Sequence, residues 1–134
     1  MARLDLHPGV RLLDVAAGTG ALATAAARRG ASVLAIDSSR GMVAFLARRA
    51  REEGLSNLDA RVMDGQKLDL PDASFDLACS VFGVMLFADH RAGLVEMRRV
   101  LVPGGSARLA VRAPPERLAH PRIRGQAVRD AFPI

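Results

Sequence analysis

The stretch LLDVAAGTGALA, residues 12–23, decides the fold of this chain. An apolar run ends at Asp14, passes through small residues that include Gly18 and Gly20, and leads into an alanine-rich segment. Glycine lets the backbone approach a ligand closely, and alanine is the strongest helix former. The pattern is typical of a strand that turns directly into a helix, and it predicts a ligand site at that turn.

Four further apolar runs follow, and helix-forming segments separate most of them. Several runs are apolar throughout, as strands buried on both faces of a sheet are. The predicted strands are Val10–Val15, Ser32–Asp37, Leu58–Met63, Phe75–Phe82 and Ser106–Arg112. The predicted helices are Gly20–Arg29, Ser39–Glu53 and Asp89–Leu101, which stop at Gly30, Gly54 and the Pro103-Gly104-Gly105 turn. Helical spacing in the second helix predicts an apolar face of Met42, Phe45, Leu46 and Ala50.

Strands that alternate with helices predict an α/β fold, a doubly wound parallel sheet of about five strands with helices on both faces. The segment 64–74 is predicted as a loop or one short helical turn between the third and fourth strands. We place one domain over residues 1–113. Residues 114–134 form an arginine-rich tail whose pattern allows a helix, interrupted near Pro121.

Composition narrows the function classes. The net charge is +5, but Lys67 is the only lysine, and the arginines stand mostly where helices end and their charge complements the helix dipole. The chain has no Trp or Tyr to stack on bases, so we expect no nucleic-acid partner. No apolar run approaches the roughly 20 residues of a membrane span, and the N-terminus lacks a signal-peptide core. We therefore expect a cytoplasmic protein.

Metal and disulfide chemistry are not expected either. Cys79 is the single cysteine, which excludes an internal disulfide and a cysteine-based zinc site, and its apolar surroundings favour a buried inert thiol. No group of His, Asp and Glu has the spacing of metal ligands, so we predict no metal.

Polar and small residues stand at the ends of four predicted strands. Because the carboxyl ends of parallel strands share one edge of the sheet, these segments should meet there. Asp37 ends the second strand, where a carboxylate is well placed to bind both hydroxyls of a ribose. The segments are Asp14 with Ala16–Gly20, Asp37, Asp64 with Gly65, and Ser80 to Phe82. The sequence therefore predicts a ligand that contains a nucleoside.

Two kinds of nucleoside-containing ligand fit the turn after the first predicted strand. The residues from Gly18 to Ala23 fit the dinucleotide pattern G-x-G-x-x-G/A, which would indicate a nicotinamide-dependent oxidoreductase. However, Asp14 stands four residues before Gly18, and an anion is a poor neighbour for a pyrophosphate. It is a good neighbour for an ammonium group or for a sulfonium-bearing amino acid.

The whole series of motifs resembles the class I S-adenosylmethionine-dependent methyltransferases. VRLLDVAAGTGALA is similar to their first motif, VLAIDSSRGMVAFLARRA to the second, RVMDGQKLDLPDASFDLACSVFGVMLFAD to the third and fourth, and EMRRVLVPGGSARLAV to the element that follows. The match runs from about Val10 to Val111 and looks closest to the ubiquinone/menaquinone-biosynthesis branch. Ala16 is the visible departure, since the broader family often has a glycine there, although alanine also occurs at this position in this branch. The resemblance implies a Rossmann-like sheet.

The resemblance also implies roles for individual residues. The cofactor would be S-adenosylmethionine, with its methionine part in the first loop, its ribose at Asp37, its nucleoside near Met42 and its adenine at Asp64 and Gly65. Ser80 and Val81 would line the methyl-donor side. The implied cofactor-binding residues are Asp14, Ala16, Ala17, Gly18, Thr19, Gly20, Asp37, Ser38, Met42, Asp64, Gly65, Ser80 and Val81.

Simpler roles stay open for several of these residues. Asp14 could hold the next loop, Asp37 could be an N-cap, Asp64 could be a turn residue and Met42 could be ordinary core. His90 lies near the expected pocket mouth and could act as a general base, although a solvated helix start also accounts for it.

The implied activity is methyl transfer to a small-molecule acceptor by in-line displacement, and the acceptor stays open. A non-catalytic module that binds the cofactor or a partner is the alternative from another class. The chain is short for this family, because few residues precede Val10 and the last two strands of the full fold are missing. We therefore expect a truncated product whose open fifth strand is covered by a second copy or by a complementing chain.

Overall fold

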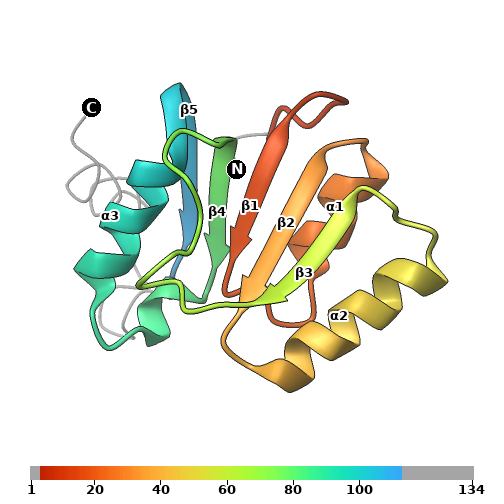
Figure 1. Ribbon diagram of the computed structural model, residues 1–134, viewed down its shortest axis with the longest axis horizontal. Helices are drawn as coiled ribbons and strands as arrows, with labels where there is room; N and C mark the ends of the chain where they lie inside the picture. The colour runs from red at the N-terminus through yellow and green to blue at the C-terminus, as the bar shows by residue number, and fades with distance from the viewer. Residues whose placement is uncertain (1–3, 113–134) are drawn as a thin grey trace.

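The computed structural model describes residues 4–112. One sheet of five parallel strands forms the centre of the molecule, in the order β3-β2-β1-β4-β5 (Figure 1). This confirms the predicted fold class. The strands are β1 Arg11–Val15, β2 Ser32–Asp37, β3 Leu58–Val62, β4 Phe75–Val81 and β5 Leu101–Ala110.

Helices cover both faces of this sheet. The helices α1 (Ala21–Arg28) and α2 (Arg40–Glu52) lie on one face. The helix α3 (His90–Val100) and the 3₁₀ turn η1 (Val84–Leu86) lie on the other. The side chains of Ser39 and Asp89 cap α2 and α3 by accepting hydrogen bonds from Met42 N–H and Ala92 N–H. Caps of this kind stabilise a helix start by about 1 kcal/mol.

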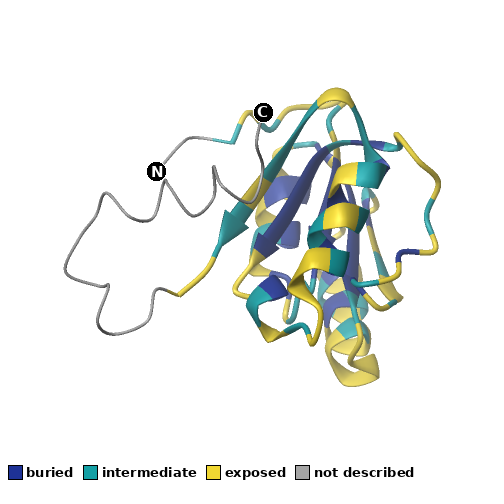
Figure 2. Cartoon of the chain, turned by 90° about the vertical axis from the view of Figure 1, so that its left-hand side faces the viewer, coloured by how far each residue is buried: buried dark blue, intermediate teal, exposed yellow. Residues whose placement is uncertain are grey.

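The core forms two layers, one on each face of the sheet. Leu12 packs with the alanines of α1 on one face, whereas Leu13 and Val15 pack with Met97 and Val100 of α3 on the other. Successive residues of a strand point to opposite faces, so an uninterrupted apolar run is what this arrangement requires. Figure 2 shows the central strands buried behind α3, while β5 at the edge is only half-buried.

The last strand differs from the prediction. We expected a strand over Ser106–Arg112 after a glycine turn, but β5 begins at Leu101, directly after α3, and ends at Ala110. Its pairing jumps from Phe75 opposite Leu101 to Leu77 opposite Ser106. Pro103 and the two glycines lie in the resulting bulge, where a proline needs no ladder partner.

The apolar face of α2 is narrower than predicted. Leu46 and Ala50 are buried, but Met42 and Phe45 are each 41% exposed. The helix packs on the edge strand β3 and on β2, so the sheet covers only part of the apolar stripe. The proposal that Met42 is ordinary core is therefore wrong, and its side chain is free to contact a ligand.

No helix within 4–112 is long and apolar enough to span a membrane. The arginine-rich tail 114–134 and its predicted helix lie outside the described residues.

Candidate functional site

The predicted site segments converge at one edge of the sheet. All five strands run in the same direction, so the turns after β1, β2 and β3 and the end of β4 meet at the lower edge in Figure 1. The chain order reverses between β1 and β4, which are neighbours in the sheet. Open α/β sheets bind ligands in the crevice at such a reversal.

The loop after β1 has an unusual backbone. Ala16, Gly18 and Gly20 all have positive φ, at 58°, 56° and 80°. The conformation is comfortable for glycine and strained for alanine, by roughly 1–2 kcal/mol. Ala16 therefore adopts the same positive φ as the two glycines of the loop, at a cost in backbone strain.

The two glycines of this loop have different neighbours. A Cβ on Gly20 would overlap Cδ1 of Leu46 in α2, so Gly20 is required by the packing of the helix on the loop. A Cβ on Gly18 would meet no atom within 4 Å. The space beside Gly18 is thus free for a ligand that approaches the backbone.

Asp37 links this loop to the start of α2. Its Oδ2 accepts a hydrogen bond from Gly18 N–H at 2.9 Å, and its Oδ1 accepts one from Ser39 N–H at 2.9 Å. Ser39, not Asp37, is the N-cap of the helix, so the N-cap alternative is wrong. A carboxylate has about four acceptor sites. Asp37 is half-buried and has capacity left for hydroxyl donors.

Asp14 is almost completely buried, with 2% of its surface exposed. Burial raises the pKa of its carboxyl to about 7, a hydrogen bond from the Ala23 amide acts in the opposite direction, and the charge of Asp37 adds to the rise. The structure therefore brings Asp14 beneath the loop, and its contact with the methionine part of a cofactor stays a prediction.

Asp64 and Gly65 form a tight turn after β3. Asp64 is exposed, and its Oδ1 accepts a hydrogen bond from Gln66 N–H at 2.8 Å, as the turn alternative predicted. A Cβ on Gly65 would overlap Cζ of Phe87, whose ring also lies against Gly93. Phe87, which the sequence analysis did not select, therefore packs against the turn and supports it.

The end of β4 presents buried polar and exposed apolar groups. Ser80 is 1% exposed, and its Oγ accepts a hydrogen bond from Val84 N–H at 3.1 Å. Val81 is 45% and Phe82 is 48% exposed. The φ of Phe82 is 61°, a rare value for a bulky residue that is typical of functional sites. Val81 and Phe82, rather than the Ser80 side chain, face outward here.

Gly83 joins the end of β4 to the first loop. A Cβ on Gly83 would overlap Cβ of Ala16, so the two turns on either side of the chain reversal are in close contact. The sequence analysis did not select Gly83, although a glycine directly after a predicted strand end signals such an approach. Ala17 and Thr19 lie on the first loop and Ser38 lies on the turn after β2; Thr19 and Ser38 are exposed.

His90 is the first residue of α3 and is exposed. Its Nε2 lies 3.1 Å from the carbonyl oxygen of Met85 in η1. This position is what a solvated helix start predicts, and a role as general base stays a prediction.

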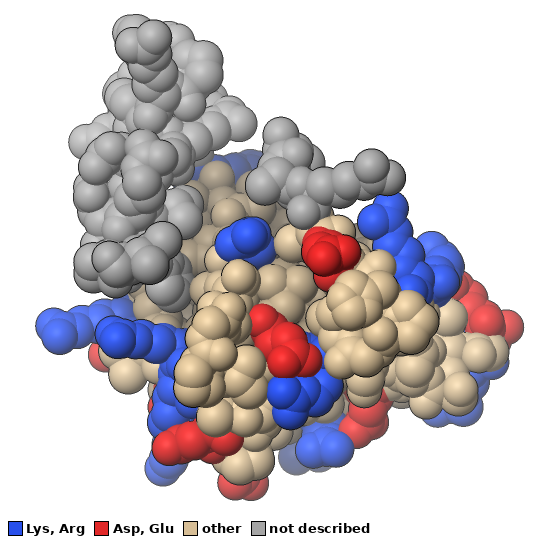
Figure 3. Space-filling model, turned by 90° about the horizontal axis from the view of Figure 1, so that it is seen from above, with Lys and Arg blue, Asp and Glu red and all other residues tan. Residues whose placement is uncertain are grey.

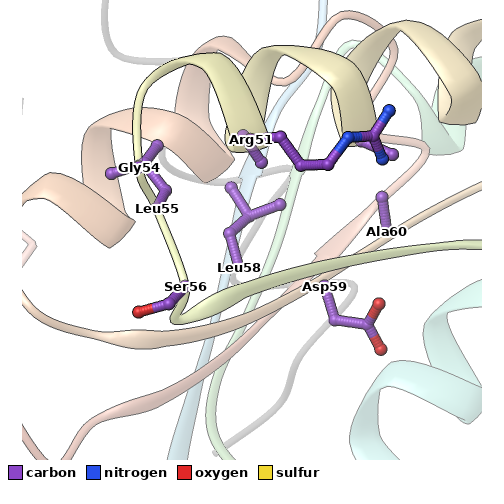
Figure 4. A pocket seen from close by; sticks show the side chains of 9 residues that line it. Arg51, Gly54, Leu55, Ser56, Leu58, Asp59 and Ala60 are labelled. Carbon is purple, nitrogen blue, oxygen red and sulfur yellow. The ribbon is translucent and has the colours of Figure 1, made fainter.

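Two grooves lie away from this edge. One of about 420 Å³ lies between α2 and β3; in it Leu58 points toward α2 and Asp59 points away from it (Figure 4). Another of about 320 Å³ lies near the starts of β1, β2 and β4. Charges of both signs are mixed on the face at the amino ends of the strands (Figure 3). Neither groove contains a predicted site residue.

Known proteins share this architecture. Residues 12–105 match the family described as "Methyltransferase domain". The demethylmenaquinone methyltransferase of Corynebacterium glutamicum is 41% identical over 108 residues, which cover 81% of this chain and 44% of that protein. The nocamycin O-methyltransferase of Saccharothrix syringae is 37% identical over an alignment of 135 positions, which covers 96% of this chain and 48% of that protein. The structure of a SAM dependent methyltransferase from Aquifex aeolicus matches with a TM-score of 0.75 at 26% identity, over 95% of this chain and 73% of that one.

The fold, the loop after β1 and these matches define one class of protein. The chain belongs to the methyltransferase domain family. The resemblance seen in the sequence motifs is thereby confirmed. The chain spans less than half the length of the two curated relatives named above.

Proposed function

We propose that this chain binds S-adenosylmethionine at the carboxyl edge of the sheet and transfers its methyl group to a small-molecule acceptor. One observation carries the proposal. The carboxylate of Asp37 at the end of β2 is hydrogen-bonded to Gly18 N–H, and the Cα of Gly18 faces open space. A ribose acceptor and a close backbone approach are thus side by side, as a nucleoside ligand requires.

The residues present fit this cofactor. Asp37 has free acceptor capacity for the two ribose hydroxyls, with Ser38 exposed beside it. Met42 is exposed on the first turn of α2, where it can cover the nucleoside. Asp64 is exposed at the next turn, where it can accept from the adenine amino group. The loop Ala16–Gly20 above Asp14 would hold the methionine part, and Ser80 and Val81 would stand on the methyl-donor side.

Methyl transfer from a sulfonium requires mainly that the protein orients the two reactants. S-adenosylmethionine supplies an activated methyl group on a sulfonium. The residues of this edge hold one reactant so that the acceptor can approach in line, and orientation of two bound reactants contributes up to roughly 7–11 kcal/mol. Val81 and Phe82 expose apolar side chains at the end of β4, against which the acceptor would pack. A base is needed only where the acceptor must lose a proton, and His90 is the candidate.

Calorimetric titration with S-adenosylhomocysteine tests the proposal, with NAD as the competing ligand. We expect micromolar binding of S-adenosylhomocysteine alone. Asp37→Ala should weaken it at least tenfold, because a hydrogen bond to a charged group contributes about 1.5–3 kcal/mol. Asp69→Ala, at an exposed carboxylate in the segment 63–74, is the matched control and should bind normally.

Three results would contradict the proposal. Binding of NAD in place of S-adenosylhomocysteine would favour the nicotinamide alternative. Equal loss in the Asp37 and Asp69 variants would remove the assigned ribose site. Binding without turnover on any methyl acceptor would favour the non-catalytic module.

A further inference from the structure

The segment 63–74, between β3 and β4, contains neither helix nor strand, yet it carries Asp64 and Gly65. Most connections in compact domains are only about 4–6 residues long, and this one is clearly longer. Here Leu68 is buried, with 5% of its surface exposed. The loop is therefore anchored, and the anchor lies on α3.

Arg99 of α3 spreads its guanidinium over this loop. Its Nη1 donates to the Leu70 carbonyl at 2.8 Å and to Oδ1 of Asp72 at 2.6 Å. Its Nη2 donates to the Leu68 carbonyl at 2.9 Å. The planar fork of five N–H donors thus satisfies three acceptors spread over one irregular segment, which a lysine cannot do.

Glu96, one turn before Arg99 on the same helix, binds both Arg99 and the loop. Its Oε1 accepts from Arg99 Nε at 2.9 Å, and its Oε2 accepts from Leu68 N–H at 2.7 Å. Both polar groups of the Leu68 backbone are therefore held by α3. We call Glu96 and Arg99 the α3 clasp.

The clasp acts on the turn that carries Asp64. Lys67 N–H donates to the Asp64 carbonyl at 3.1 Å, so the turn ends directly before Leu68. In its middle, Oε1 of Gln66 accepts from Asp89 N–H at 2.7 Å, at the cap of the same helix. One rigid helix thus holds the turn at two points, and the position of the Asp64 carboxylate depends on both.

We infer that Arg99, oriented by Glu96, is a positioning residue that places Asp64 to read the amino group of the adenine ring. The inference rests on the proposed function, because it concerns the adenine end of that site. It gives a role to the Glu-x-x-Arg pattern within EMRRVLVPGG. A residue that only stabilised the fold would weaken binding of every nucleoside ligand equally. The α3 clasp instead sets the discrimination between ligands with and without that amino group.

The experiment measures two affinities in each variant by calorimetry. The probes are S-adenosylhomocysteine and S-inosylhomocysteine, which carries an oxygen in place of the 6-amino group. In the unsubstituted chain we expect about tenfold tighter binding of the first, the value of one charged hydrogen bond. In Arg99→Lys we expect about tenfold weaker binding of the first probe and a ratio between the probes of about twofold.

A second clasp variant and a control variant complete the experiment. Glu96→Gln loses the charge that orients Arg99 and should lower the ratio in the same direction, even if Arg99→Lys does not fold. Arg98→Lys, at the exposed neighbouring position, should leave both affinities unchanged.

The outcomes separate this inference from the proposed function. If the unsubstituted chain binds S-adenosylhomocysteine and both clasp variants keep its tenfold ratio, the inference is overturned and the proposed function stands. A ratio near one in the unsubstituted chain also overturns it, because Asp64 would then not read the amino group. If the folded, unsubstituted chain binds neither probe, the proposed function itself is overturned.

Discussion

At the scale of single residues, two carboxylates at the same edge of the sheet have opposite environments. Asp37 is half-buried, and its carboxylate accepts hydrogen bonds from two backbone N–H groups. Asp14 is buried between β2 and β4, where desolvation disfavours its charge and raises its pKa to about 7. Asp37 therefore keeps acceptor sites open to hydroxyl donors, whereas Asp14 changes its charge near neutral pH.

The raised pKa of Asp14 predicts a pH-dependent stability. Its ordinary value is about 3.9, so between about pH 4 and pH 7 the folded chain binds this proton more tightly than the unfolded chain. The free energy of unfolding then falls by roughly 2–4 kcal/mol as pH rises through this window. Above the window it levels off. Asp14→Asn cannot titrate, so its stability should lack this fall.

Urea unfolding of the unsubstituted chain and of Asp14→Asn between pH 5 and pH 8.5 checks this prediction. This range lies above the window in which Asp76 titrates, whose pKa is held at about 2 by its hydrogen bonds with Arg11. A constant difference between the two stability curves would contradict the raised pKa.

At the scale of elements, the loop after β1 is shaped by the helix beside it. Leu46 of α2 occupies the space where Gly20 has no side chain, and Arg49 donates to the Thr19 carbonyl at 3.4 Å. Asp37 holds the other side of the loop through Gly18 N–H. The loop therefore depends on α2 and on the end of β2 for its conformation as well as on its own glycines.

This packing predicts different effects for the two glycines. Gly20→Ala should destabilise the fold by roughly 2–3 kcal/mol, because a strained φ adds to an overlap with Leu46. Gly18→Ala meets no protein atom and should destabilise it by only about 1 kcal/mol, from φ alone. It should nevertheless weaken S-adenosylhomocysteine binding more, since its methyl group fills the open space.

Thermal unfolding and calorimetric titration of the two variants check this contrast. If Gly20→Ala is the more stable variant, the role of Gly20 in packing against Leu46 is contradicted. If Gly18→Ala binds S-adenosylhomocysteine normally, the assignment of the open space to a ligand is contradicted.

At the scale of the whole molecule, the sheet order sets where a ligand can bind. In the order β3-β2-β1-β4-β5, β1 lies in the centre, and the strand order reverses between β1 and β4. The edge strand β5 is only half-buried along its length. Coverage of this edge by a second copy or a complementing chain stays a prediction, as does a cytoplasmic location.

A ligand at this reversal should stabilise the molecule as a whole. With S-adenosylhomocysteine at about 100 times its Kd, linkage adds about 2.7 kcal/mol to the free energy of unfolding. For a domain of this size Tm should rise by roughly 8–12 °C. A thermal-shift measurement with NAD at the same concentration is the control, and an equal rise with NAD would contradict the choice of cofactor.

The order of elements could be predicted from the sequence because each strand and helix has its own local signal. Apolar runs, capping residues and helix-stopping glycines placed β2 at its observed bounds and α1, α2 and α3 within one residue. The start of β5 could not be predicted, because Leu101 and Val102 become strand only through pairing with β4. The turn η1 was missed for a similar reason, since its first N–H depends on the Ser80 hydroxyl.

For the site, the sequence by itself determined which residue types stand at the carboxyl ends of the strands, and hence the family. Only the tertiary structure decided that Asp14 is buried, that Met42 is exposed, and that Gly18 faces open space while Gly20 packs on a helix. It alone connects Arg99 with the turn at Asp64. Burial and hydrogen bonding depend on segments far apart in the chain, and no local pattern contains those distances.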